Sequence, residues 1–166
     1  MVFDLPAPEQ QGSKSLVGSI AARRSVREYT NALLPIGVLS QLLWSAQGVT
    51  GPDTKRATPS AGGLSPLHLK ILVQRVSELE PGIYEYQADN HSLKLIGNRA
   101  PEGAVQALGI GDQPWLKEAA LVIGVAAKLG EAVRHFEAQP PQGERGARYV
   151  YMETGALAQN VHLQST

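Results

Sequence analysis

The chain has 166 residues, of which 43% are apolar and 18% are charged, a composition that predicts one globular domain and excludes wholesale disorder. Its 15 Lys and Arg balance 15 Asp and Glu, and a zero net charge argues against nucleic acid or an anionic membrane as the main partner. Cys is absent, which excludes disulfides and a cysteine nucleophile, and the 4 scattered His predict no metal site.

Residues 1–12 are expected to form an extended arm, because Pro6 and Pro8 block helix formation. The arm lacks the basic and apolar regions of a signal peptide, and the longest apolar run is too short to cross a bilayer. We therefore expect a cytoplasmic protein in which residues 13–166 form the single domain.

Two helices are predicted in the first third of the chain. Ser13 can cap a short helix that runs to about Arg23, and apolar residues at helical spacing predict a second helix over residues 35–47. The Gly- and Pro-rich residues 50–66 fit no regular element. They are expected to form a long loop, and such loops often carry function.

Alternating apolar residues predict a strand over residues 68–76 and a hairpin that pairs residues 83–87 with 92–96. Residues 119–127 hold no charge, which predicts a strand buried on both faces. Short helices are expected over residues 101–109, 112–118 (with Asp112 as the cap) and 129–138.

A long helix is predicted over residues 145–163, with apolar residues around nearly its whole circumference. Such a helix must be buried on most sides, either as a central core helix or at a subunit interface. Its one obligate charge after Arg148 is Glu153, which we expect to play a structural role by capping or by pairing with Arg148. The order of the elements predicts an α+β fold.

Three guanidinium groups lie close together in the stretch Arg23-Arg24-Ser25-Val26-Arg27. A guanidinium is a planar, permanently charged fork that suits phosphate oxygens, so this stretch indicates a bound phosphate ester. The alternative is a solvated basic turn at a helix end, where positive charge is favourable in any case.

The stretch Pro59-Ser60-Ala61-Gly62-Gly63 is a second indication of a ligand. Two adjacent Gly remove side chains where a flat ligand could lie against the backbone, and Ser60 offers a hydroxyl to a ring atom. The stretch matches neither a P-loop nor a dinucleotide-binding fingerprint. Taken alone, the stretch from Pro59 to Gly63 could also be a glycine-rich turn without a ligand. Together with the arginine stretch, it suits a mononucleotide with a planar ring.

Five blocks follow one another along the chain. They are Arg23-Arg24-Ser25-x-Arg27-x-Tyr29, Leu39-Ser40-Gln41-Leu42-Leu43-Trp44-x-Ala46-Gln47-Gly48, Arg56-x-x-Pro59-Ser60-Ala61-Gly62-Gly63, Pro81-Gly82-x-Tyr84-x-Tyr86 and Glu153-x-Gly155-x-x-x-Gln159-Asn160-x-x-Leu163-Gln164. Together they resemble the FMN-dependent nitroreductase superfamily, with the SagB-type dehydrogenases as the closest branch. The resemblance implies a nitroreductase-like α+β fold with a central, mainly antiparallel sheet flanked by helices. It also implies an obligate homodimer, with the long buried helix and FMN at the dimer interface.

The resemblance also implies roles for individual residues. The phosphate and ribityl end of FMN would be held by Arg23, Arg24, Ser25 and Arg27. The isoalloxazine ring would be lined, from the partner subunit, by Pro59, Ser60, Ala61, Gly62 and Gly63. Asn160 would face the cofactor region, and the alternative for it is a polar contact between packed helices.

The implied activity is hydride transfer from NADH or NADPH through FMN to a small organic acceptor, with no side chain needed as a general acid or base. Family chains usually continue past this helix through a Gly-Leu-Gly segment, whereas this sequence stops at Thr166. The rival expectation is therefore a non-catalytic flavin-binding or pseudo-enzyme dimeric remnant. Gly143-Glu144-Arg145-Gly146 resembles the azoline-oxidising branch, but Pro141-Gln142 stands where that branch has Lys-Tyr, so azoline oxidation is not expected.

Overall fold

The computed structural model describes residues 1–51, 53–111 and 113–166, which fold around a five-stranded antiparallel sheet. The strands are β1 (Val2–Asp4), β2 (Leu67–Val73), β3 (Gly82–Gln87), β4 (Ser92–Gly97) and β5 (Leu121–Ala127). The α-helices are α1 (Leu16–Ala22), α2 (Ile36–Gln47), α3 (Leu129–His135) and α4 (Arg145–Gln164). Short helical turns are η1 (Ala61–Gly63), η2 (Gln106–Leu108) and η3 (Pro114–Glu118). The predicted α+β class is confirmed.

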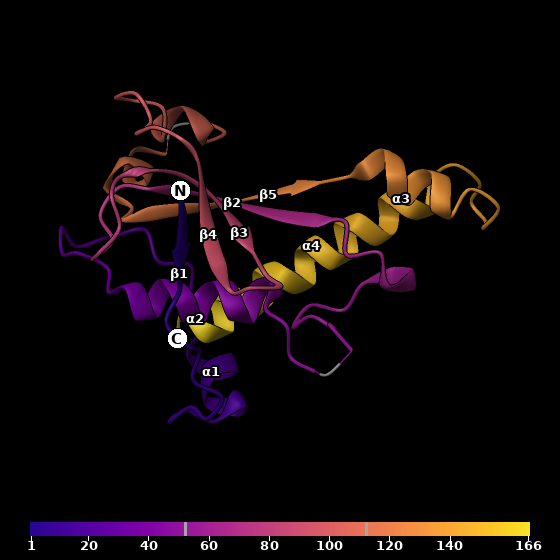
Figure 1. Cartoon of the computed structure of the whole chain (residues 1–166), viewed down its shortest axis with the longest axis horizontal. Coiled ribbons are helices and arrows are strands. Elements are labelled where there is room, and N and C mark those ends of the chain that lie inside the picture. Colours follow the sequence, from indigo (N-terminus) through magenta and orange to yellow (C-terminus); the bar gives the residue numbers. More distant parts are fainter. Residues whose placement is uncertain (52, 112) are drawn as a thin grey trace.

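The strand order is β1-β4-β3-β2-β5. The predicted hairpin is present, with Tyr86 of β3 opposite Leu93 of β4. Side chains alternate between the two faces of a strand, and the alternate residues of β2 are buried. Figure 1 shows α2 and α4 on the same side of the sheet. The core forms there, where the fully buried Leu39 and Leu43 of α2 join Ile71 of β2 in one hydrophobic cluster.

The N-terminal arm begins as part of the sheet, because β1 pairs with β4 and places Phe3 opposite Leu93. The extended conformation predicted for the arm is confirmed over this part. The predicted cap of α1 is wrong, since Ser15 rather than Ser13 accepts a hydrogen bond, at 3.1 Å, from Gly18 N. None of the residues of α1 is buried, so this helix adds little to the core.

Two other predictions are wrong. Residues 101–109 form only the turn η2, because Gly103 adopts a φ of 79° that a continuous helix cannot contain. β5 lies at the edge of the sheet and Val125 is 37% exposed, so this strand is not buried on both faces. The other short helix begins at Pro114 as η3, and its predicted cap Asp112 lies outside the described residues.

Helix α4 lies where the sequence predicts it, but it is not buried on most sides. In the single chain it buries one stripe, which consists of Gly146, Val150, Glu153 and Leu157. Met152, between two of these residues, is 69% exposed. The central-core alternative is therefore excluded for the single chain, and the subunit-interface alternative stays a prediction. No helix in the described part of the chain is long and apolar enough to cross a membrane.

Candidate functional site

The arginine cluster (Arg23, Arg24, Ser25 and Arg27) follows α1 and lies in an irregular segment. Arg24 Nη1 donates to the carbonyls of Ala21 and Arg23 at 3.0 and 2.7 Å, and Arg27 Nη1 donates to Ser25 O at 3.4 Å. Within residues 1–51, 53–111 and 113–166, no carboxylate forms an ion pair with any of these three Arg. The positive charge of the cluster is therefore uncompensated by the residues described.

Most of the cluster borders one cavity. Arg24, Ser25 and Arg27 line a cavity of about 760 Å³, together with Trp115, His162 of α4 and the two residues that follow this helix. The Arg27 guanidinium carbon lies 5.6 Å from the centre of the Trp115 ring, which is a cation–π contact. Arg23 is partly buried and does not line this cavity. The structure thus brings three of the four predicted residues to one place.

The second predicted stretch forms the glycine loop, which consists of Pro59, Ser60, Ala61, Gly62 and Gly63. Gly62 and Gly63 have φ values of 60° and 68°, the left-handed conformation that favours glycine. The Ser60 hydroxyl oxygen accepts a hydrogen bond from Ser65 N at 2.9 Å and closes the loop on itself. The two positive φ values and this local hydrogen bond therefore give the loop a tight turn.

Helix α4 fixes the glycine loop through Glu153. This carboxylate is only 7% exposed, and its Oε1 accepts a hydrogen bond from Ala61 N at 2.8 Å. The expected pairing of Glu153 with Arg148 is wrong, because Arg148 Nη2 instead donates to Glu144 Oε2 at 2.7 Å. Glu153 does not cap the helix either, so both expected forms of its structural role are wrong, and its observed partner is the glycine loop.

One side of the glycine loop is bare. A Cβ added at Gly63 would meet no atom within 4 Å, whereas one at Gly62 would lie 3.2 Å from both His135 Nε2 and the Phe136 ring. Gly62 therefore packs against the end of α3, and Gly63 faces open space. The loop residues that line the adjoining cavity of about 900 Å³ are Pro59, Ser60 and Gly63.

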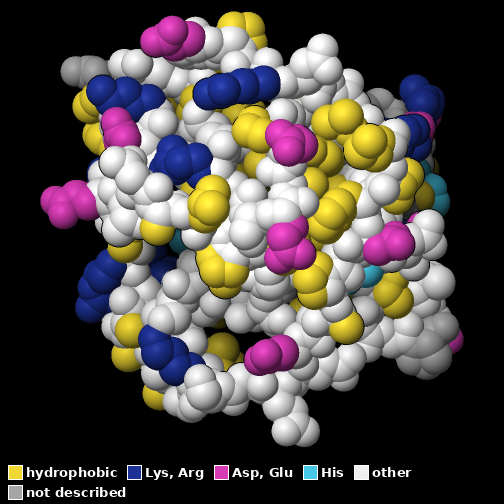
Figure 2. All heavy atoms as spheres, turned by 60° about the vertical axis from the view of Figure 1, so that its left-hand side comes forward, with side chains coloured by type: hydrophobic (Ala, Val, Ile, Leu, Met, Phe, Trp, Pro, Cys, Tyr) yellow, Lys and Arg dark blue, Asp and Glu magenta, His cyan; other side chains and the backbone are white. Residues whose placement is uncertain are grey.

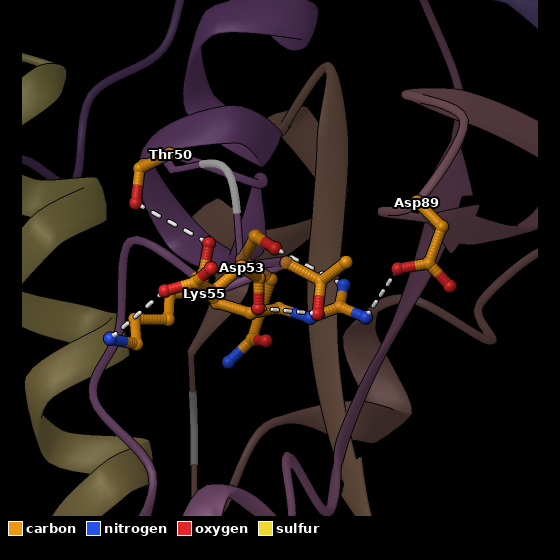
Figure 3. Close-up of polar contacts among 7 residues, drawn as sticks. Thr50, Asp53, Lys55 and Asp89 are labelled. Atoms are coloured by element: carbon orange, nitrogen blue, oxygen red, sulfur yellow. Dashed lines mark hydrogen bonds and ion pairs between the residues drawn. The ribbon is translucent and has the colours of Figure 1, made fainter.

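The base of the glycine loop is a small antiparallel ladder that the sequence did not predict. Val49 and Arg56 form a β-bridge, and Thr50 N donates to Lys55 O at 2.9 Å. Arg56 Nη2 then donates to Asp89 Oδ1 at 2.8 Å, which ties this ladder to the β3–β4 turn (Figure 3). Arg56 belongs to one of the five blocks, but Asp89 lies 33 residues away and nothing in the sequence marks it as the partner.

Asn160 of α4 joins the last turn of α2 to the segment that leads into the glycine loop. Its Nδ2 lies 3.2 Å from Ser45 O, 3.3 Å from Ala57 O and 3.4 Å from Thr58 Oγ1. The polar contact between packed elements is thus confirmed. Asn160 also lines a cavity of about 650 Å³ beside Trp44, and its role toward a cofactor stays a prediction.

The arginine cluster and the glycine loop do not meet within one chain. Neither cavity includes a residue of the other stretch. The cluster lies near the end of α4 at His162, whereas the loop is held farther back at Glu153, and the helical rise between these two residues is about 14 Å. Figure 1 shows α1 beside the C-terminus and α3 at the opposite end of α4.

The surface charge is mixed. On the face shown in Figure 2, Asp and Glu side chains lie among the Lys and Arg side chains, and apolar side chains gather between them. This face therefore presents no broad area of a single sign, in keeping with the formal net charge of zero.

The sequence model of the nitroreductase family matches residues 20–166, a range that includes the arginine cluster, the glycine loop and α4. This chain belongs to the nitroreductase family. A protein of Methanocaldococcus jannaschii assigned as a nitroreductase is 38% identical to it over 144 residues, which are 87% of this chain and 69% of that protein.

Two crystal structures assigned as nitroreductases share the fold. The protein from Ralstonia eutropha has a TM-score of 0.77 at 26% identity, and the match covers 98% of this chain and 70% of that one. The protein from Anabaena variabilis also has a TM-score of 0.77, at 27% identity, over 99% of this chain and 33% of that one. The nitroreductase-like fold expected from the sequence is therefore confirmed.

Membership of the nitroreductase family indicates an oxidoreductase, and members of this family generally use a flavin with a nicotinamide donor. For this nitroreductase-family chain, the FMN roles of the arginine cluster, the glycine loop and Asn160 stay predictions. The sequence did not identify Glu153 as the support of the loop. The one signal it offers is that Glu153 is the single carboxylate within α4, and this does not point to the loop.

Proposed function

We propose that this nitroreductase-family chain binds FMN at the interface of a homodimer and transfers hydride from NADH or NADPH to a small organic acceptor. One observation carries the proposal. A cationic cavity and a bare glycine loop, which suit the two ends of one mononucleotide, lie on surfaces that a single chain keeps apart.

The arginine cluster fits the phosphate end of FMN. Among the described residues, the hydrogen bonds of its guanidinium groups go only to nearby backbone carbonyls. In these bonds only the donor is charged, whereas in a bond to a phosphate dianion both partners are charged and the attraction is stronger, so a phosphate can replace the carbonyls. The residues that would hold the phosphate and ribityl end are Arg23, Arg24, Ser25 and Arg27.

The glycine loop fits a flat ring. At Gly63 the backbone borders open space in a conformation that strains any residue with a Cβ, so a ring can approach the main chain directly. The bonds from Ala61 N to Glu153 and from Ser65 N to Ser60 hold the loop in shape before a ligand arrives. Such preorganisation lowers the entropy lost on binding.

A homodimer would unite the two parts of the site. Helix α4 exposes Tyr151 by 71% and Met152 by 69%, and both lie within two residues of the loop support Glu153. A second copy packed against this face would bury these apolar side chains and would bring the glycine loop of one chain to the arginine cluster of the other.

When bound, FMN would supply the redox chemistry as a two-electron carrier between the nicotinamide and the acceptor. The chain itself would bind and orient the cofactor, and we assign no residue as a general acid or base. We further propose that the SagB-type dehydrogenases are the closest branch and that azolines are not the substrate, because Pro141 and Gln142 replace the Lys-Tyr pair. A cytoplasmic location and small-molecule rather than nucleic-acid partners belong to the same proposal.

The test begins with purified protein that is incubated with FMN and freed of unbound flavin. We expect the protein to retain the flavin absorbance bands and to lose them anaerobically when NADH or NADPH is added. A protein that stays colourless would overturn the FMN site. A bound flavin that neither donor bleaches would overturn the oxidoreductase activity and favour the non-catalytic remnant.

A further inference from the structure

The phosphate cavity, which we define as the cavity of about 760 Å³ lined by Arg24, Ser25 and Arg27, has two further basic side chains in its wall. They are Lys14, from the segment before α1, and His162, from the last turn of α4. Neither is a named residue of the five sequence blocks. Among the lining residues that the structure describes, none is Asp or Glu. The cavity is therefore more basic than the arginine cluster alone makes it, in a chain whose formal net charge is zero.

Lys14 connects the segment before α1 to the C-terminal end of α4. Its Nζ donates to the Thr166 carbonyl, and Figure 1 shows α1 beside the C-terminus. Within the described part of the chain, none of the ion pairs involves Lys14. An ammonium group has three N–H donors. Because the Thr166 carbonyl takes one of them, Lys14 keeps two donors and its positive charge for a ligand in the cavity.

The end of α4 would repel an anion if its carbonyl groups were uncovered. The last carbonyls of a helix carry the negative end of its dipole, and His162, Ser165 and Thr166 all line the cavity. The His162 carbonyl accepts hydrogen bonds from Ser165 Oγ at 3.0 Å and from Thr166 Oγ1 at 2.9 Å. The Thr166 carbonyl accepts one from Lys14. Hydroxyl donors and a cation thus cover this helix end, so that a phosphate can approach it.

His162 is exposed and borders the same cavity. The hydrogen bonds from Ser165 and Thr166 reach its main chain, and within the described residues its side chain has no hydrogen-bond or ion-pair partner. A neutral imidazole has one N–H donor and a protonated imidazole has two. In either state the ring can therefore donate to one of the three strong acceptor oxygens of a phosphate group.

The arginine cluster leaves part of a bound phosphate to other residues. Arg24 and Arg27 each use Nη1 for main-chain carbonyls, and Trp115 lies against the Arg27 guanidinium at 5.6 Å. The two guanidinium groups also come from a single short segment. Lys14 and His162 come from two other segments that border the cavity. With their participation, three segments of the chain contact the phosphate instead of one.

We propose that Lys14 and His162 are phosphate-binding residues of the cofactor site. Lys14 contributes a positive charge and two N–H donors to the terminal phosphate oxygens of FMN, and His162 contributes an N–H donor. Neither residue contacts the flavin ring in this scheme. Both therefore increase the preference of the protein for FMN over riboflavin, which has the same ring but no phosphate. This assignment rests on the FMN site proposed above.

The test compares the dissociation constants of FMN and of riboflavin by flavin fluorescence in four proteins. They are the wild type, Lys14→Met, His162→Phe and Lys128→Met. Met keeps the apolar stem of Lys without its charge, and Phe keeps a planar ring without nitrogen atoms. Lys128→Met is the matched control, because Lys128 is also exposed and also lies at the start of a helix, α3, but does not line the phosphate cavity.

We expect Lys14→Met to weaken FMN binding about tenfold, the ratio for one hydrogen bond to a charged group, and His162→Phe to weaken it about fivefold. Both variants should bind riboflavin within about twofold of the wild type, and Lys128→Met should bind both flavins within about twofold. A role in folding alone would weaken the binding of both flavins together. Equal losses for the two flavins would overturn the proposal, and unchanged FMN affinity in either variant would remove that residue from the site.

A second readout needs no flavin. The chain has 2 Trp, of which Trp115 lines the phosphate cavity and Trp44 lines the separate cavity of about 650 Å³. Their indole N–H signals are followed by NMR while inorganic phosphate is added, with sodium chloride of equal ionic strength as the reference. The Trp115 signal is the one absent from Trp115→Phe. We expect phosphate to shift it but not the Trp44 signal, and Lys14→Met to need about tenfold more phosphate.

This second readout separates the two proposals. If the wild type binds neither flavin, the proposed function fails, and the phosphate titration alone decides on the two residues. In that case, a Trp115 signal that phosphate does not shift in the wild type would exclude the phosphate site. A signal that shifts at the same phosphate concentration in the wild type and in both variants would exclude Lys14 and His162 as its ligands.

Discussion

Replacement of Glu153 tests how the glycine loop is held. The carboxylate is 7% exposed and accepts a hydrogen bond from Ala61 N at 2.8 Å. A hydrogen bond to a charged group contributes about 1.5–3 kcal/mol, and the truncation also leaves the Ala61 N–H without its partner. We therefore expect Glu153→Ala to lower the free energy of unfolding by about 2–3 kcal/mol. Glu153→Gln keeps a neutral acceptor and should lower it by roughly half as much.

Urea unfolding followed by circular dichroism measures this difference. Glu144→Ala is the control at the N-cap of the same helix, because the Glu144 side chain makes no capping hydrogen bond, is 65% exposed, and forms its ion pair with Arg148 at the surface. Such a pair contributes about 0.5 kcal/mol or less. The Glu153 variants should also bind FMN more weakly, whereas Glu144→Ala should not. Equal unfolding free energies for Glu153→Ala and Glu144→Ala would refute the role of Glu153 as the support of the loop.

Four further substitutions separate packing, backbone conformation and ligand binding. In Gly146→Ala the new Cβ would overlap the Ala132 carbonyl, so α3 and α4 must separate and the unfolding free energy should fall by about 1–3 kcal/mol; an unchanged melting temperature would contradict this contact. Gly63→Ala should destabilise by roughly 1 kcal/mol because of its positive φ, whereas Gly37→Ala, in open space on α2, should stabilise by about 0.5–1 kcal/mol. Thermal unfolding of both proteins checks the opposite signs. Arg27→Gln should leave stability within about 0.5 kcal/mol but weaken FMN binding at least about tenfold in equilibrium dialysis, and equal affinity would remove Arg27 from the phosphate site.

The elements that the sequence predicted best are those whose signals are local. The second helix was predicted over residues 35–47 and lies at Ile36–Gln47, because its apolar spacing and the flanking Pro35 and Gly48 are contained within it. The β3–β4 hairpin was predicted for the same reason. The cap of α1 was missed because Ser13 and Ser15 are equally good cap residues, and only the backbone geometry selects Ser15.

The parts that the sequence could not predict depend on contacts between distant segments. Ala61 and Glu153 are 92 residues apart, and no periodicity links them. The contact between Ser40 and His91 is similar, since Ser40 lies on α2 and His91 lies in the β3–β4 turn, and the two meet only when the sheet packs against α2. The sequence correctly predicted that α4 carries apolar residues on several sides. The prediction that most of these sides are buried is wrong for the single chain, because part of the helix faces away from the core.

The most direct measurement is a subunit complementation experiment, because the account places the two halves of each site on different chains. One variant loses the cluster (Arg24→Gln with Arg27→Gln) and the other loses the bare loop (Gly63→Val), and neither is expected to bind FMN alone. After the two are unfolded and refolded together, random pairing makes half of the dimers mixed, and about one quarter of all sites should be intact. We predict that the mixture regains about that fraction of wild-type flavin binding and bleaching by NADH or NADPH. A mixture that binds no more flavin than its two components measured separately would contradict a site shared between two chains.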